Sequence, residues 1–340
     1  MTEHAVPLTL ASRALMPPLT AAVFFVLAAA LASLLWGAGP VGPAEALQVL
    51  IGQGTEEARF VILELRLPRT AIAIVTGLAL AIAGALLQAL TRNPLAEPGL
   101  LGVSGGSAFA VTLAVMLGAS SATLTTLVAQ VGALAGCSLV MLATRSRGLA
   151  ADPVRLVLAG ATVTGLLLSL TSVLMLADQR AADEIRFWIT GSIAGTPFSH
   201  LLAVLPTLMV AGVLVVMVAS PLAAMSLGER AALGLGHKPG RIRLMVLVAV
   251  ALLVGGATAL AGPLVFAGLV VPFIARAIGG PDIRKTLWLC LPIGPALLLV
   301  ADTLARVIGA PAELPLGVIT ALLGAPVLLY IVRSGRMPTL

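Results

Sequence analysis

The stretch from Arg66 to Ser107, RLPRTAIAIVTGLALAIAGALLQALTRNPLAEPGLLGVSGGS, decides how the rest of the chain can be read. Two arginines flank a proline at its start. About twenty apolar or small residues follow, enough for a helix to cross a bilayer core of roughly 30 Å. The run breaks at Asn93-Pro94 and Glu97-Pro98, and a second apolar run begins at Gly102. The stretch therefore predicts a membrane hairpin whose tip is held open by prolines.

The composition places the whole chain in a membrane. Of its 340 residues, 59% are hydrophobic and only 10% are charged, whereas soluble domains carry about 25% charged residues. The mean hydropathy is +1.11. We therefore expect a polytopic membrane protein without a separate water-soluble domain. Cys137 and Cys290 both lie within apolar runs, which favours packing roles over a disulfide or a metal pair.

Apolar runs of membrane-spanning length recur along the sequence. The first follows Arg13 and is long enough to span, so we interpret it as a span rather than as a cleaved signal peptide. The block from Arg243 to Ile278 is too long for one span, and Gly262-Pro263 supplies a turn that divides it. The chain is thus predicted to be a single all-helical transmembrane domain over residues 1–340. It has ten expected transmembrane helices, near 18–36, 70–90, 99–118, 122–143, 154–177, 198–218, 243–261, 263–278, 286–305 and 315–333.

The distribution of charge gives the direction of these spans. With the N-terminus inside, fourteen of the twenty lysines and arginines fall on the cytoplasmic side and six on the outer side. This is the bias that membrane proteins show. The formal net charge of +6 is therefore a signal of topology rather than of nucleic-acid binding. An even number of spans then places both termini in the cytoplasm.

Small residues indicate where helices are expected to pack closely within the bilayer. Two sets stand out: one face of the second span with Gly77, Ala81, Gly84 and Gln88, and the pairs Gly102/Gly106 and Gly132/Gly136. The fifth span has a polar stripe instead, with Thr162, Gly165, Ser169 and Ser172 at positions i, i+3, i+7 and i+10. Its hydroxyls can bond to carbonyls of their own helix, or they can line a water-filled path. We favour the path.

The sequence lacks the motifs of self-contained chemistry. Gly102-Val103-Ser104-Gly105-Gly106 satisfies the G-x-S-x-G pattern of a nucleophilic serine. An intramembrane protease would also need a histidine deep in a span, however, and His4, His200 and His237 lie in loops or at a span end. A catalytic site and a metal site in this chain are therefore not expected.

Nor does the chain carry an obvious source of energy. No G-x-x-x-x-G-K-[ST] loop for binding nucleotide phosphates is present. Ion-coupled transporters usually carry an ionisable residue near the middle of the bilayer. Here Asp302 comes closest, and Arg306 lies one helical turn away as its expected partner. A membrane protein with neither device is expected to obtain its energy from a partner.

Two segments, one on each side of the membrane, contain residues that suit the binding of a partner protein. On the outer side, Arg66, Arg69 and Arg306 run against the basic-inside trend and suit an acidic partner, although they can also simply anchor helix ends. On the inner side, the loop at 220–243 contains SLGERAALGLGHKPGR and predicts a short amphipathic helix. That helix is either a connector or a docking element for a soluble motor. Its candidate residues are Ser226, Leu227, Gly228, Glu229, Arg230, Leu233, Gly234 and Gly236.

Several blocks together resemble the permeases of the ATP-binding-cassette (ABC) importers for iron-siderophores, haem and cobalamin. These blocks occur in the same order as in that family, over residues 60–336. The matching blocks are 66–69 with Gly84 and Gln88, 93–98, 99–107, 155–160, 226–229 with Leu235 and Gly236, 262–272, 301–302 with Arg306, and 313–326. The segment Arg186-Phe187-Trp188 with Gly191-Ser192 is more similar to the siderophore branch. One departure is Phe273, where the family usually has a histidine.

The resemblance implies ten helices per subunit and a pair of permeases in the bacterial cytoplasmic membrane. It also implies two cytoplasmic ATPases, which hold the ATP and Mg²⁺, and an external binding protein that delivers the ligand, so no cofactor is expected in this chain. By position, Arg66, Arg69 and Arg306 match arginines that grip acidic residues of the binding protein. The loop at Ser226 to Gly236 matches a coupling helix for the ATPase. Asp152, Pro153 and Val154 match the region of the cytoplasmic gate.

The sequence thus predicts the membrane-spanning subunit of an ATP-driven importer for a metal chelate, a ferric siderophore in first place. Haem and cobalamin stay open as cargo, because path-lining hydroxyls and apolar residues do not identify a ligand. A homodimer and a pairing with a related permease are also both open. The alternatives from other classes are an ion-coupled secondary transporter and an intramembrane enzyme.

Overall fold

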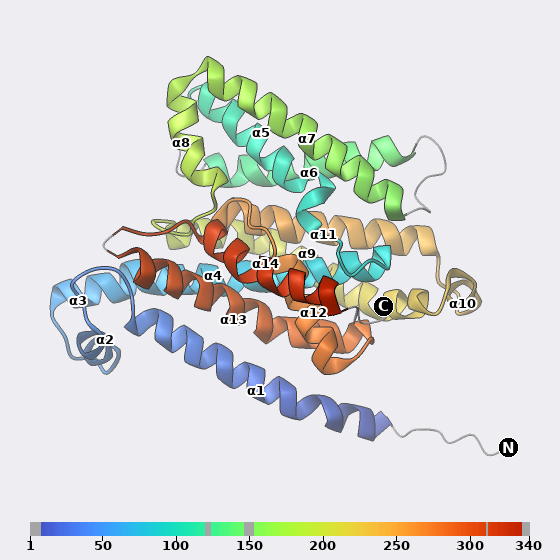
Figure 1. The fold of residues 1–340 in the computed structure, drawn as a ribbon, viewed down its shortest axis with the longest axis horizontal. Helices are drawn as coiled ribbons and strands as arrows, with labels where there is room; N and C mark the ends of the chain where they lie inside the picture. Colours follow the sequence, from blue (N-terminus) through green and yellow to red (C-terminus); the bar gives the residue numbers. More distant parts are fainter. Residues whose placement is uncertain (1–7, 120–123, 146–152, 311, 335–340) are drawn as a thin grey trace.

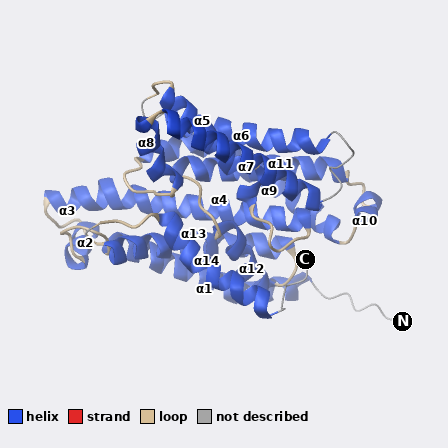
Figure 2. Cartoon of the chain, turned by 45° about the horizontal axis from the view of Figure 1, so that its top comes forward, coloured by secondary structure: helices blue, strands red, loops and turns tan. Residues whose placement is uncertain are grey.

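The chain forms an all-helical bundle. A computed structural model describes residues 8–119, 124–145, 153–310 and 312–334, and within these ranges all regular secondary structure is helical (Figure 2). Seven helices are long and apolar enough to cross a membrane, and three shorter apolar helices lie at Val103–Met116, Ala267–Gly279 and Leu316–Tyr330. The prediction of an all-helical polytopic membrane protein is confirmed.

The centre of the bundle is α4 (Leu67–Thr91), which packs against both α11 (Pro239–Ala261) and α13 (Ile283–Gly309) (Figure 1). Over the most apolar part of α4 and of α11, 78% of the residues are buried. Helix α1 (Leu8–Leu35) lies along α13, and α12 (Ala267–Gly279) lies between α13 and α4. These contacts explain why α4 and α11 are apolar all round rather than on one stripe.

A second group of helices covers one side of this centre. It consists of α5 (Val103–Met116), α6 (Leu124–Arg145) and α7 (Pro153–Ala177), at the top of Figure 1. Helix α9 (Phe198–Ser226) packs on α11, and α14 (Leu316–Ser334) reaches α12 and α13. Only 17% of the residues in the most apolar stretch of α7 are buried within this chain. Its outer face therefore needs to be covered by lipid or by another protein.

Glycines allow the backbones of these helices to touch. A Cβ atom added at Gly77 would overlap the carbonyl of Gly294, and one added at Gly84 would overlap the carbonyl of Gly268. The pairs in α5 and α6 likewise face each other, Gly106 against Gly132 and Gly102 against Gly136. The small-residue faces expected from the sequence are therefore helix contacts.

Short helices lie at the two ends of the bundle. At one end are α2 (Pro43–Leu50), α3 (Glu56–Phe60), a π-helical turn η1 (Val61–Arg66) that leads into α4, and α8 (Gln179–Ile189). At the opposite end is α10 (Glu229–Gly234), toward which α1 begins and α14 ends (Figure 1). By the charge argument, the α10 end is the cytoplasmic end.

Several boundaries differ from those expected from the sequence. Helix α9 continues through Pro221 to Ser226 and α11 begins at Pro239, so the loop expected at 220–243 shrinks to 227–238 around α10. Residues 220–226 are apolar enough to stay helical, and the first helical turn tolerates a proline. At Gly262-Pro263 the chain does turn, but α12 begins only at Ala267 because Phe266 adopts a left-handed conformation with φ of 69°.

The contact between Gly84 and Gly268 gives the first testable prediction. Replacing Gly84 by alanine should lower the melting temperature of the purified protein, because overpacking of this kind costs about 1–3 kcal/mol. Gly212→Ala is the matched control, since a Cβ atom at Gly212 in α9 meets no atom within 4 Å. The reasoning on glycine packing is contradicted if both variants melt at the wild-type temperature.

Candidate functional site

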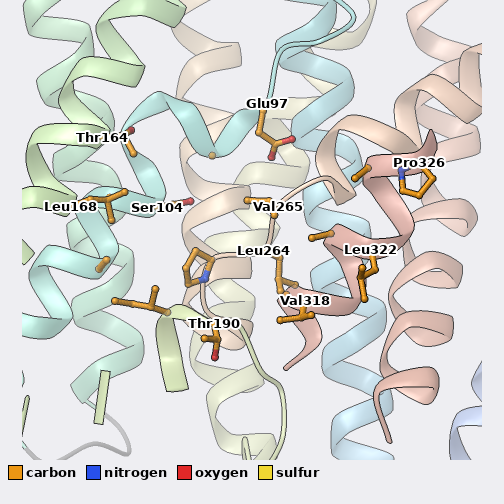
Figure 3. A pocket seen from close by; sticks show the side chains of 18 of the residues that line it. Glu97, Ser104, Thr164, Leu168, Thr190, Leu264, Val265, Val318, Leu322 and Pro326 are labelled. Atoms are coloured by element: carbon orange, nitrogen blue, oxygen red, sulfur yellow. The ribbon is translucent and has the colours of Figure 1, made fainter. Parts of the chain in front are cut away.

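A large cavity opens between α5, α7, α14 and the linker that follows α11. Its volume is about 990 Å³, in the range of pockets that take drug-sized ligands. Thr164 and Leu168 of α7 face it from one side, and Val318 and Leu322 of α14 from the other (Figure 3). Most of the lining side chains are apolar, so the cavity would hold a large solute without binding it tightly.

One carboxyl group enters this cavity. Glu97 is the only charged residue among the described lining residues, and it lies between α4 and the 3₁₀ turn η2 (Pro98–Leu101) at the proline-rich tip. Figure 3 shows its side chain pointing into the cavity. Its Oε2 atom is buried without a hydrogen-bond partner in the described part of the chain. Burial raises the pKa of the Glu97 carboxyl to about 7, although a hydrogen bond from the Gly99 N–H opposes the rise.

The outer end of the bundle holds a cluster of arginines. Arg66 is buried and donates to the carbonyl oxygens of Leu34 and Leu35, at 2.9 and 3.0 Å. Arg306 is also buried and donates to the carbonyls of Ser33 and Trp36, both at 3.0 Å. The last carbonyls of a helix have no partner within it, and cations near them are favourable. These two side chains therefore fix the end of α1.

The third arginine joins two carboxylates. Arg69 donates through Nε to Asp302 at 2.9 Å and through Nη1 to Glu313 at 2.7 Å. Arg306 approaches the other oxygen of Asp302 at 3.0 Å. Asp302 is fully buried, so its charge requires both arginines to compensate for the loss of water. The expected pairing of Asp302 with Arg306 is confirmed, and the pairing with Arg69 is additional.

At the other end, α10 presents apolar side chains to its surroundings. Leu227, Leu233 and Leu235 are each more than half exposed in this chain. Gly228 and Gly236 flank the helix with positive φ angles of 113° and 80°, which favour glycine. Glu229 forms an ion pair with Arg243 near the start of α11, and this pair links α10 to α11.

Comparison with known proteins gives the family. The model of the FecCD transport family matches residues 25–334, nearly the whole chain. The chain belongs to the FecCD transport family. It is similar to the ferric enterobactin transport system permease protein FepD of Escherichia coli (strain K12), with 39% identity over 312 residues that cover 92% of this chain and 93% of FepD. It is also similar to the Fe(3+)-citrate import system permease protein YfmD of Bacillus subtilis (strain 168), with 33% identity over 88% of this chain and 89% of YfmD.

A solved structure agrees with this assignment. It is described as an inward-facing conformation of a metal-chelate type ABC transporter, and it is 28% identical to this chain. The superposition has a TM-score of 0.75 and covers 94% of this chain and 99% of the other. The fold and the family therefore agree, and these permease relatives are transport subunits rather than enzymes.

In this FecCD-family chain, the polar stripe of α7 does not line the cavity. Thr162, Ser169 and Ser172 are exposed, and each hydroxyl donates to a carbonyl of its own helix at 2.8–3.0 Å. Gly165 is exposed as well. The neighbouring Thr164 and Leu168 face the cavity instead. A role for the stripe in the path remains a prediction about the exposed face of α7.

The other residues singled out in the sequence are the outer arginines and the gate residues. The structure brings Arg66, Arg69 and Arg306 together, as the outer docking hypothesis requires, but two of them are buried against α1. Of the expected gate residues, Pro153 begins α7 with Val154 after it, and Asp152 lies outside the described residues. Sequence reasoning missed Glu97, although its place between two prolines of the central hairpin was a usable signal.

Asp302 provides a prediction about stability. Asp302→Asn removes the negative charge between two buried arginines, and breaking a buried pair in this way costs about 3–5 kcal/mol. The variant should therefore melt well below the wild type in detergent or in nanodiscs. Glu57→Gln removes a carboxylate at an exposed position of α3 and serves as the control. Equal melting temperatures for the two variants would contradict a buried charge network.

Glu97 provides a prediction about pH. Because its pKa is raised in the folded protein from 4.5 to about 7, the folded state loses stability as pH rises through this interval. Glu97→Gln does not titrate, so its melting temperature relative to wild type should be higher at pH 8 than at pH 5. Glu64→Gln, at an exposed position, is measured in parallel. A difference that does not change with pH argues against a buried Glu97.

Proposed function

We propose that this chain is the membrane-spanning permease subunit of an ABC importer for a ferric chelate. An extracytoplasmic binding protein delivers the chelate, and a separate cytoplasmic ATPase supplies the energy. The bacterial cytoplasmic membrane is the expected location. The observation that carries this proposal is the match to the FecCD family over residues 25–334 in a chain with an open cavity of about 990 Å³.

The cargo follows from what the relatives share. FepD is named for ferric enterobactin and YfmD for Fe(3+)-citrate, and the solved relative is of the metal-chelate type. These cargoes differ in size and in ligand chemistry but have chelated metal in common. Weak binding by apolar walls is compatible with such variety, because no wall residue needs to match one chelator. A ferric siderophore is therefore the proposed class of cargo.

The incomplete wall of the cavity also supports pairing of this chain with a second permease. Its walls come from α5, α7 and α14, and α7 keeps most of its outer face uncovered. Leu158, Leu166 and Leu170 of that helix are exposed. A second copy of this chain, or a related permease, placed against α7 and α14 would cover these leucines and complete the wall. The hydroxyl stripe of α7 would then lie near the interface.

The cytoplasmic end supplies the proposed contact with the ATPase. Helix α10 is short and linked to α11 by the Glu229–Arg243 ion pair, and three leucines in and beside it are exposed. Burial of apolar surface is the main favourable term in most protein association, so these leucines suit an apolar cleft on a soluble partner. A shift of α10 on ATP binding would be passed directly to α9 and α11, which it joins.

Co-purification tests this function. The tagged chain is expressed with the ATPase and the binding protein of the same transport system, and retention of the ATPase is measured. Wild type should retain it, whereas Leu233→Asp should lose it because a charge replaces an exposed contact leucine. Leu47→Asp makes the same change on α2 at the outer end and should retain the ATPase. If the wild type retains no ATPase, the partner-driven importer is excluded, and transport that collapses with an ionophore becomes the next test.

A further inference from the structure

The outer end of the bundle contains a second hollow, of about 350 Å³. It is bounded by η1, the segment 193–197, the end of α13 and the segment before α14. Arg66, Arg69 and Arg306 line it together with Glu64 and Glu313. Gly37 lies at its edge, where a Cβ atom would come within 3.0 Å of both Arg66 and Arg306. The hollow is thus built closely around guanidinium groups.

The three arginines are not equally available. Arg66 and Arg306 are buried and committed to carbonyls of α1, as described above. Arg69 holds two carboxylates of different exposure: Asp302 is 0% exposed, and Glu313 is 33% exposed. Asp302 cannot leave without uncovering a buried charge. Glu313 can turn into water, because exposed ion pairs contribute only about 0–1 kcal/mol.

The charges of the ion-paired group at this hollow balance only while Glu313 is present. Arg69 and Arg306 carry two positive charges, and their partners Asp302 and Glu313 carry two negative charges. When Glu313 swings away, one positive charge is left without compensation, at the exposed side of Arg69. A single carboxylate from outside restores the balance, and the hollow has room for one acidic side chain.

Glu313 also holds the start of a cavity-lining helix. It precedes α14 by three residues, and Gly317 and Val318 in the first turn of α14 line the large cavity. Two backbone hydrogen bonds hold the same region, from Leu314 N–H to Ala305 and from Gly317 N–H to Gly191, both at 3.3 Å. Both are long for N–H···O bonds, and the Arg69–Glu313 ion pair is a further link, which joins this segment to α4.

We propose that Glu313 occupies, on Arg69, the place that a carboxylate of the extracytoplasmic protein partner takes on docking, and that this exchange releases the start of α14. The inference rests on the proposed function, because it requires a binding protein that docks on the outer face. It adds that the permease carries its own competitor for the docking site. Docking thereby loosens the helix that walls the cavity at its outer end.

The test compares two glutamates that line the same hollow. The permease–ATPase complex is placed in nanodiscs, and the dissociation constant of the purified binding protein is measured. Glu313→Gln should tighten binding about two- to five-fold, because the competitor is lost. Glu64→Gln removes the same charge from the same hollow, but Glu64 forms no ion pair with any described residue, so its dissociation constant should stay at the wild-type value.

A second measurement needs no partner. Amide hydrogen exchange at residues 314–318 should be faster in Glu313→Gln than in wild type or in Glu64→Gln. Unchanged or weaker binding by Glu313→Gln, equal tightening by both variants, or unchanged exchange would overturn the inference and leave the importer intact. If the wild type does not bind the binding protein at all, the proposed function itself fails, and this inference fails with it.

Discussion

The buried carboxylate of Asp302 is the constraint on which the outer half of the structure depends. A buried charge is tolerated only when it is paired and hydrogen-bonded, and Asp302 meets this condition through Arg69 of α4 and Arg306 of its own helix. Arg306 in turn holds the end of α1, and Arg69 holds the segment before α14. One carboxylate thus links four helices, α1, α4, α13 and α14.

Much of the helical architecture could be predicted from the sequence because it depends on local signals. The apolar runs, the break at Gly262-Pro263 and the small residues at Gly102 and Gly106 each act within one or two turns. The Asp302–Arg306 pair is also local, at a spacing of four residues. Such features are visible in one sequence, since the partner or the consequence lies nearby in the chain.

The long-range contacts could not be predicted in the same way. Arg66 and Arg306 are expected on the outer side, either for an acidic partner or as anchors of helix ends, but their partners are not identifiable. Those of Arg66 are carbonyls 25–32 residues earlier, and Arg306 reaches back 270 residues to Trp36. The hydroxyl stripe of α7 does not reveal where the cavity lies, for a different reason. Its hydroxyl groups can donate hydrogen bonds to carbonyls of their own helix. Their spacing therefore does not show which face of α7 lines the cavity.

The central hairpin connects the cavity to the cytoplasmic end. Arg92, just after α4, adopts a left-handed conformation with φ of 49° and donates to the carbonyl of Met225 at 2.7 Å. Met225 lies in the last turn of α9, directly before α10. Five residues after Arg92 the same tip places Glu97 in the cavity. A movement of α10 therefore has a short covalent and hydrogen-bonded route to the cavity wall. At the proline-containing tip, the backbone can change conformation without unfolding a membrane-spanning helix.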